Sequence, residues 1–378
     1  MMKDYSRKGG DTMSYTISPI IKVTETCNFE CSFCRYSNHK QKARVIDVDL
    51  VKKILIESAE INAKSSKKVK VLFHGGEPLL WGIDNFYEIH KYEKNISKYY
   101  GVRFFNSIQT NASMISDEWI QFFLEDHTGI GISLDGSIGL NAHYSGDAVQ
   151  SFSRTISMLN KLKNANIPYG ILSVITNEHI VAGPNNFYNF LLENGIRNCG
   201  LCYCYNPDDD CSVDPKKLGY YLSNLFDLYF NGKERINIRE FNGAITSILT
   251  GKHSCCSHHN RERCGYYLTF LPSGDAFFCD PYDLRKENCL GNIRKHSILD
   301  LISCEKHNEL SNTICLQIDN YCKTCSIKEI CGYGCPRTDI DNKENYFCCT
   351  HRILYTHIEE VVNKITGNYK HQAEEICG

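Results

Sequence analysis

Short apolar segments alternate with longer amphipathic segments along the first half of the chain. Six short segments are rich in Val, Ile, Phe and Tyr, as β-strands are, at residues 19–23, 69–73, 102–109, 129–134, 169–175 and 198–203. Between them, apolar residues recur at helical spacing at residues 48–61, 83–99, 117–124, 152–165 and 185–193. This alternation predicts an α/β fold with a parallel sheet. Because six units are too few for a closed eight-stranded barrel, we expect a partial (β/α)6 barrel with its chemistry at the C-terminal ends of the strands.

The pattern changes at the polar stretch of residues 206–217. Helices are predicted at 217–230, 239–249 and 352–365, and a hairpin at 266–271 and 276–279. We therefore divide the chain into an N-terminal extension (1–16), the partial barrel (17–206), a helical linker (207–252), a small cysteine-rich and loop-rich domain (253–350), and a C-terminal helix and tail (351–378). A small region without a large apolar core usually needs disulfide or metal cross-links.

Composition narrows the class of protein. The 378 residues carry a net charge of −2, so no overall basic field exists to attract nucleic acid or an anionic membrane. No apolar run is long enough to span a bilayer, and the N-terminal residues lack the apolar core of a signal peptide. In such a chain, 21 cysteines favour metal or cluster binding over disulfides. We expect a cytoplasmic protein with no nucleic-acid or membrane partner.

Three cysteines lie together directly after the first predicted strand. Cys27, Cys31 and Cys34 share one short loop. Three soft thiolate ligands suit an iron–sulfur cluster or zinc, and not magnesium or calcium. A four-iron cluster held by three cysteines leaves one iron open, which can bind the amino and carboxylate groups of S-adenosylmethionine (SAM). A zinc loop is the alternative.

This Cys-x3-Cys-x2-Cys loop resembles the signature of the radical SAM enzymes. The resemblance implies a [4Fe-4S] cluster that cleaves SAM into methionine and a 5′-deoxyadenosyl radical, which then abstracts hydrogen from the substrate. The segment His-Gly-Gly-Glu-Pro at the end of the second strand is similar to the SAM-binding segment of that family. By this resemblance, SAM contacts fall to Tyr36, Gly75, Gly76, Glu77, Pro78, Asn111 and Ser133. For Tyr36, Asn111 and Ser133, the alternative is an ordinary role at a strand end or in packing.

A second set of cysteines resembles the SPASM extension, a module that binds two auxiliary clusters in some radical SAM enzymes. The similarity extends over about residues 17–365. It implies that one [4Fe-4S] cluster binds Cys256, Cys264, Cys279 and Cys335. The other would bind Cys322, Cys325, Cys331 and Cys348. The adjacent Cys255 and Cys349 are alternatives to Cys256 and Cys348, and two zinc ribbons are the alternative to clusters.

Asp280 directly follows Cys279, an arrangement that resembles the anaerobic sulfatase-maturating enzymes. The resemblance implies that Asp280 is the catalytic base, since a carboxylate beside a cluster places a proton acceptor next to an electron acceptor. A turn-forming aspartate is the alternative. The chain departs from that family at His74, where the family has Gln, and at Ser137, where it has Pro. In that family a histidine follows this segment, and His143 is the candidate for its counterpart here.

The resemblance leaves three functions open. The first is a radical SAM/SPASM maturase that oxidises or cross-links a side chain of a peptide or protein, such as a cysteine-rich ribosomal peptide. The second is a sulfatase maturase that converts Cys or Ser to formylglycine. The third, from another class, is a zinc-ribbon scaffold. Either enzyme would use SAM, three [4Fe-4S] clusters, a peptide or protein substrate, and an electron donor such as flavodoxin or ferredoxin.

Overall fold

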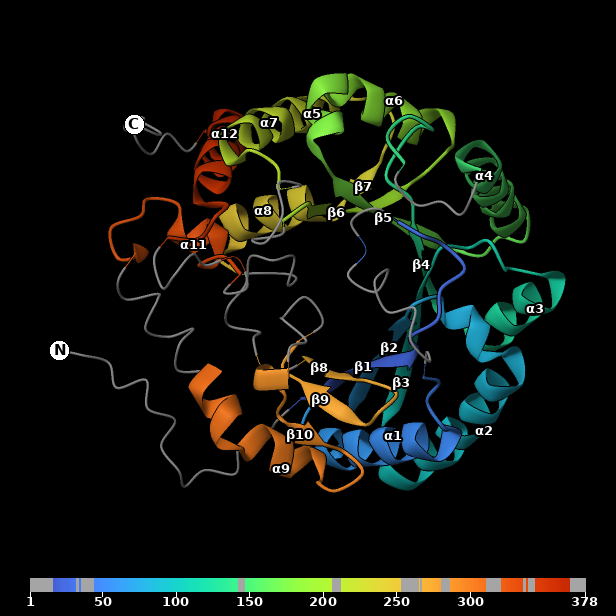
Figure 1. Ribbon diagram of the computed structural model, residues 1–378. Coiled ribbons are helices and arrows are strands. Elements are labelled where there is room, and N and C mark those ends of the chain that lie inside the picture. The colour runs from blue at the N-terminus through green and yellow to red at the C-terminus, as the bar shows by residue number, and fades with distance from the viewer. Residues whose placement is uncertain are drawn as a thin grey trace.

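Within the described residues, one sheet of ten strands organises the molecule (Figure 1). The computed structural model describes residues 16–31, 34, 44–141, 147–205, 212–252, 265, 267–279, 286–310, 321–335, 338 and 344–367. Six parallel strands follow one another in sequence order: β1 (Ser18–Thr24), β2 (Lys68–Gly75), β3 (Arg103–Thr110), β4 (Gly129–Ser133), β5 (Tyr169–Ile175) and β6 (Asn198–Tyr203). The sheet curves into an arc, which confirms the predicted partial barrel.

Helices cover the outer side of this arc (Figure 1). They are α1 (Val48–Ala63), α2 (Ile83–Tyr100), α3 (Asp117–Asp126), α4 (Ala148–Asn164), α5 (Asn177–Ala182) and α6 (Pro184–Glu193), with the short 3-10 helix η1 (Pro78–Trp81) before α2. Side-chain oxygens cap several N-termini, as Asp47 does for the N–H of Leu50. Helix α4 begins four residues before the prediction because Asp147 caps it by accepting from the N–H of Gln150.

The apolar core lies between the helices and the sheet. Val51, Ile54 and Leu55 of α1 are fully buried on one face of that helix. Burial of one such side chain contributes about 1.5–3 kcal/mol relative to exposure in water. Repeated along α1 to α6, this burial holds the helices on the outside of the arc. The ends of the strands are thereby left available for polar side chains.

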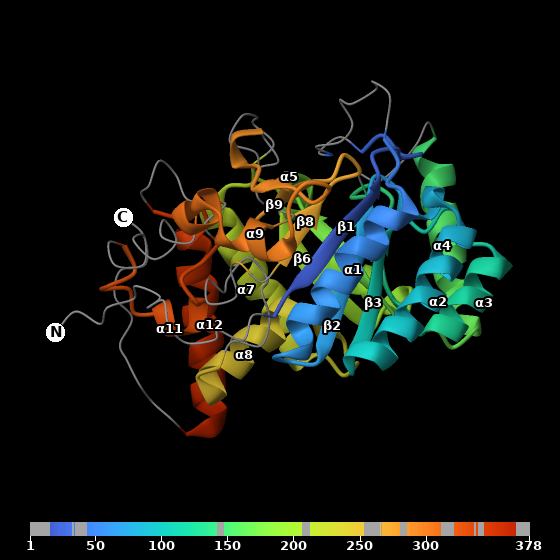
Figure 2. The same ribbon diagram turned by 90° about the horizontal axis from the view of Figure 1, so that it is seen from below.

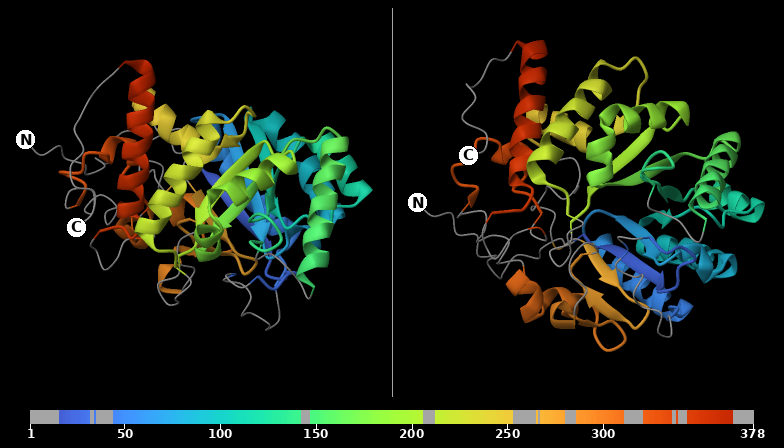
Figure 3. Two further views of the ribbon diagram at one scale, coloured as in Figure 1. Left: turned by 90° about the horizontal axis from the view of Figure 1, so that it is seen from above. Right: turned by 45° about the horizontal axis from the view of Figure 1, so that its top comes forward.

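A second group of helices lies beside β6. The chain continues through α7 (Pro215–Asn231), the short edge strand β7 (Asn237–Ile238) and α8 (Arg239–Thr250), and it returns near its end as α12 (Cys348–Thr366). Figure 3 shows α12, in red, alongside the yellow α7 and α8. Gly219 permits the close approach, because a Cβ atom there would lie 2.9 Å from Cβ of Ile353.

The predicted hairpin is confirmed, and it joins the barrel sheet. Its strands β8 (Tyr267–Phe270) and β9 (Asp275–Phe277) pair antiparallel, and β10 (Gly291–Asn292) pairs antiparallel with the other edge of β9. Strand β8 also pairs in parallel with β1 (Figure 2). The barrel sheet therefore includes strands from the segment that we predicted as a separate cysteine-rich domain (253–350). The domain boundaries stay a prediction.

Smaller helices complete the C-terminal part. They are η3 (Lys286–Asn288), α9 (Ile298–Ser303) and α11 (Lys328–Cys331). The N-terminus of α9 is tied to α1, because the N–H of Ile298 donates to a carboxylate oxygen of Glu57 at 2.7 Å. Across the described ranges, every helix is too short or too polar to cross a bilayer.

Candidate active site

The three cysteines of the first loop lie at the C-terminal end of β1. The N–H of Cys34 donates to the carbonyl of Cys31 at 3.1 Å, and the N–H of Phe29 donates to Sγ of Cys27 at 3.3 Å. Burial, together with the nearby Glu77, Cys31 and Cys34, raises the pKa of Cys27 to about 11, and the hydrogen bond from the N–H of Phe29 opposes the rise. Three thiols that interact with one another on one loop fit a cluster with one open iron, because a bound metal replaces the thiol protons.

Two glycines allow β2 to end against the segment that leads into this loop. A Cβ atom at Gly76 would lie 2.0 Å from the carbonyl oxygen of Thr26 and 2.9 Å from the N atom of Cys27. Gly75 has a φ of +135°, and a Cβ there would lie 2.3 Å from the carbonyl oxygen of Thr24. The N–H of Gly76 donates to that Thr24 oxygen at 2.8 Å. Only glycine fits this close backbone approach, which fixes the position of the cysteine loop.

Glu77 connects the ends of β2 and β3. Its side chain is 1% exposed and accepts hydrogen bonds from Oγ1 of Thr110 at 2.7 Å and from the N–H groups of Asn111 and Leu79 at 2.8 and 3.0 Å. Burial raises its pKa, and these hydrogen bonds oppose the rise. Glu77 therefore fixes the edge beside Cys27, and its predicted contact with SAM stays a prediction.

Asn111 connects β3 to the cysteine loop. Its Nδ2 donates to Oδ1 of Asn28 at 2.9 Å and lies 4.0 Å from Sγ of Cys27. The predicted SAM ligand Ser133 ends the neighbouring strand β4, and its hydroxyl accepts from Nε2 of Gln109 at 3.0 Å. The structure therefore brings Asn111 to the cysteine loop and places Ser133 on the same strand edge. Their contacts with SAM stay predictions.

One charged residue inside the barrel was missed by the sequence analysis. Lys22 on β1 is only 1% exposed and is paired in register with His74 of β2. A lysine at this depth requires a polar or anionic partner, and Lys22 does have an interaction partner. The available signal was a charged residue between apolar neighbours in a strand, five positions before Cys27.

The four thiols predicted for one auxiliary cluster lie together. Burial raises the pKa of Cys331, and the negative charges of Cys348, Cys325 and Cys322 raise it further. The N–H of Cys325 donates to the carbonyl of Cys322 at 3.2 Å. The Sγ of Cys331 lies 3.6 Å from Nδ1 of His351. These donors fit a four-thiolate cluster.

Two residues of α12 beside this thiol cluster were not predicted. His351 faces Cys331, and Arg352 hydrogen-bonds Cys325 and interacts electrostatically with Cys348. A cation and an imidazole near thiolates stabilise their negative charge. The signal was their position directly after Cys348 on an amphipathic helix.

The other predicted auxiliary site is only partly within the described residues. Asn345 links one of its cysteines to the thiol cluster, because its Nδ2 donates to the carbonyl of Cys335 at 2.6 Å while its own carbonyl accepts from the N–H of Cys348 at 2.9 Å. Cys279 is half-buried at the end of the hairpin. The remaining predicted site residues lie outside the described residues: Tyr36, Cys256, Cys264 and Asp280, with the alternatives Cys255 and His143.

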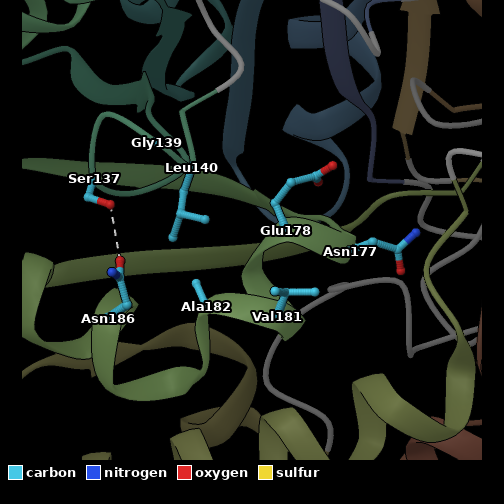
Figure 4. Close-up of a pocket in the computed structure, with 8 residues that line it drawn as sticks. All are labelled: Ser137, Gly139, Leu140, Asn177, Glu178, Val181, Ala182 and Asn186. Carbon is cyan, nitrogen blue, oxygen red and sulfur yellow. Dashed lines mark hydrogen bonds between the residues drawn. The ribbon is translucent and has the colours of Figure 1, made fainter.

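A cavity of about 440 Å³ opens beside the ends of β4 and β5 (Figure 4). It is formed by residues 137–140, α5 and the start of α6. Ser137 donates from its hydroxyl to Oδ1 of Asn186 at 3.0 Å across it. Val181 on α5 is 88% exposed, and it also lines a second cavity of about 460 Å³ toward Tyr346. Helix α5 was too short for its period to be recognised from the sequence.

Comparisons with known proteins agree with this geometry. Residues 21–182 match the Radical SAM superfamily. The chain is 25% identical to the cysteine-type anaerobic sulfatase-maturating enzyme of Clostridium perfringens strain 13, over 94% of this chain and 99% of that protein. It is 28% identical to the enzyme of that name from Clostridium novyi strain NT, over 93% and 96%.

Two solved structures share the fold. The structure of native anSMEcpe with bound AdoMet and Cp18Cys peptide superimposes with a TM-score of 0.82 at 24% identity, over 94% of this chain and 99% of that one. The structure of Streptococcus suis SuiB bound to S-adenosylmethionine gives 0.60 at 16% identity, over 88% and 76%. Residues 21–182 therefore belong to the Radical SAM superfamily, and the chain as a whole is similar to anaerobic sulfatase-maturating enzymes along most of its length.

Proposed function

We propose that this enzyme is an anaerobic sulfatase-maturating enzyme of the cysteine type. It would oxidise one cysteine side chain of a sulfatase segment to formylglycine. The observation that carries the proposal is the end-to-end similarity to relatives of that name, which match 94% of this chain and 99% of their own length. The thiol loop and the thiol cluster near α12 support it, because this oxidation needs both a radical source and an electron acceptor.

Each group of site residues has a separate role in the proposed oxidation. Cys27, Cys31 and Cys34 would hold a [4Fe-4S] cluster, which together with SAM would supply the 5′-deoxyadenosyl radical needed to take a hydrogen atom from the substrate Cβ. Asn111 and Glu77 hold the cysteine loop against the strand ends. The substrate then loses one proton and one electron, and water replaces its sulfur, which leaves as hydrogen sulfide.

The C-terminal cysteines provide the electron acceptor in this proposal. Cys322, Cys325, Cys331 and Cys348 would hold one auxiliary [4Fe-4S] cluster, and Cys279 and Cys335 would take part in the other together with Cys256 and Cys264. Asp280 would accept the proton beside Cys279. An external donor such as flavodoxin or ferredoxin would supply the electron that starts each turnover.

The cavity of Figure 4 is the proposed contact surface for the substrate backbone. It lies at the edge of the barrel where the strands end, the edge from which barrel enzymes of this type act. Its lining combines the amide of Asn186 and the hydroxyl of Ser137 with the exposed apolar side chain of Val181. Such a surface can bind both the polar main chain and an apolar side chain of an extended peptide.

A second candidate is a maturase that oxidises or cross-links a side chain of another peptide. It is favoured by His74 and Ser137, which differ from the residues expected in sulfatase maturases. Ser137 lines the cavity, so the difference falls at the proposed substrate surface.

A peptide assay separates the candidates. The reconstituted enzyme is incubated without oxygen with SAM, a reductant and a sulfatase-motif peptide that carries Cys, Ser or Ala at the target position. We expect an aldehyde, trapped by a hydrazine and located by mass spectrometry, on the Cys peptide and none on the Ala peptide. SAM cleavage without aldehyde on either the Cys or the Ser peptide contradicts sulfatase maturation and favours the second candidate. Zinc in place of iron, with no SAM cleavage, favours the zinc-ribbon scaffold and contradicts both.

A further inference from the structure

A second set of metal-ligating side chains lies behind the sheet, outside the cysteine sites. His90 and Glu93 project from one face of α2, and Asp126 ends α3. One donor atom from each of the three lies within 4.8 Å of the others. Donors around a tetrahedral zinc ion lie about 3.3–3.6 Å apart, given bonds of about 2.0–2.2 Å to nitrogen and oxygen. Rotation of the three side chains by about 1 Å would therefore bring these donors to the spacing of a filled site.

An unpartnered carboxylate oxygen distinguishes this set from an ordinary hydrogen-bond network. Glu93 is 4% exposed, and its Oε2 accepts from Nδ2 of Asn106 at 2.6 Å. Its Oε1 has no partner, and neither has the carbonyl oxygen Oδ1 of Asn106. Two buried acceptor oxygens without donors can be satisfied by a cation, or by a proton on Glu93, because burial raises the pKa of that carboxyl to about 8.

The surrounding groups hold the other two ligands in place. Asp126 contacts Nδ1 of His90 and accepts from the hydroxyl of Thr128, and its side chain is 3% exposed. The His90 ring is 17% exposed and packs edge-on against Phe122, with the ring centroids 6.3 Å apart. Most of the site is therefore buried, and the partly exposed His90 ring marks the side from which an ion can enter.

We propose that His90, Glu93 and Asp126 bind a divalent transition-metal ion, with Zn²⁺ as the best fit. One imidazole nitrogen and two carboxylates are typical zinc ligands, and Oδ1 of Asn106 or a water completes a tetrahedron. The ion would join α2 and α3 to β3 on the outer face of the barrel. This role is structural and separate from the iron–sulfur chemistry, because the ligands face the helices and not the strand ends.

Zinc loading of the full-length chain tests this site. The iron–sulfur clusters are rebuilt first, so that the thiols predicted to bind clusters are occupied, and one equivalent of Zn²⁺ is added before desalting. We expect about one zinc per chain, with an X-ray absorption spectrum that shows a first shell of light atoms near about 2.0 Å and no sulfur near about 2.3 Å. A wild-type protein that retains no zinc, or zinc with a sulfur shell, would overturn the proposal.

Matched variants locate the ion. Glu93→Gln and His90→Asn should lower retained zinc by at least about tenfold. Loss of a metal ligand, or of a group that orients one, lowers metal affinity by at least this factor. Glu118→Gln, at the opposite end of α3, and His127→Asn, next to Asp126, change exposed residues and should retain it. Equal zinc in all four variants contradicts the site. Should a variant fail to fold, seen as a loss of iron, anomalous diffraction at the zinc edge from wild-type crystals decides, since a peak between the three ligands is required.

Discussion

Substitution of Gly76 tests how the fold positions the cysteine loop. In Gly76→Ala, the new Cβ atom would lie 2.0 Å from the carbonyl oxygen of Thr26 and 2.9 Å from the N atom of Cys27. These atoms belong to backbone, so no side-chain rotation relieves the overlap, and the loop itself must move. Gly139→Ala is the matched control, because a Cβ at Gly139 meets no atom within 4 Å.

The magnitude follows from the contacts that are lost. Relief of the overlap requires a backbone shift of about 1 Å or more, and overpacking of this kind costs about 1–3 kcal/mol. The hydrogen bonds from Gly76 N to Thr24 O and from Glu77 N to Thr26 O, both 2.8 Å, would weaken at about 0.5–1.5 kcal/mol each. The free energy of unfolding should therefore fall by about 2–6 kcal/mol. A displacement of about 1 Å at the reacting centre lowers a rate by about 100-fold.

The assay is 5′-deoxyadenosine formation, measured together with iron content after anaerobic reconstitution. Gly76→Ala should lose SAM cleavage by about 100-fold or more and keep the iron of the auxiliary sites, about eight per chain for two four-iron clusters. Gly139→Ala should match the wild type when the assay is run without peptide, because Gly139 borders the cavity proposed to bind the peptide. SAM cleavage by Gly76→Ala within twofold of the wild-type rate would refute the reasoning that this glycine fixes the loop.

Three further substitutions separate the roles of the sites. Cys31→Ala should abolish SAM cleavage while iron falls by only about four per chain; retained cleavage would contradict the ligand assignment. Asp280→Asn should still form 5′-deoxyadenosine and lose the aldehyde product in the peptide assay, and unchanged product would remove Asp280 as the base. Val181→Asp should raise KM for the peptide and leave peptide-independent SAM cleavage unchanged, whereas Val149→Asp, 60% exposed on α4, should alter neither; equal KM values for the two variants would place the peptide elsewhere.

Much of the barrel could be predicted from the sequence because its signals are local. Strands β5 and β6 have the predicted bounds, since short β-branched and aromatic segments between polar residues are typical of strands. The pairing of β8 with β1 could not be predicted, because it joins segments far apart in the chain and no local pattern encodes such a pairing. The two-residue strands β7 and β10 are too short to carry a period.

The candidate site shows the same division between local and distant signals. Cys27, Cys31 and Cys34 were selected from their spacing and from their position after the first predicted strand, and the structure places them on one loop after β1. The three hydrogen bonds that hold Glu77 come from the ends of two elements and depend on how these elements meet, so no local pattern predicts them. His351 lies beside Cys331 only because α12 packs against α11.

The most direct test of the central claim uses a sulfatase-motif peptide whose target cysteine carries deuterium on Cβ. The reconstituted enzyme is incubated with this peptide, SAM and a reductant without oxygen, and 5′-deoxyadenosine and peptide are analysed by mass spectrometry. We predict deuterium in the 5′-deoxyadenosine together with an aldehyde at the target position. Unlabelled 5′-deoxyadenosine with an unchanged peptide would contradict cysteine-type sulfatase maturation, and absence of 5′-deoxyadenosine from an iron-loaded sample would contradict the radical SAM site itself.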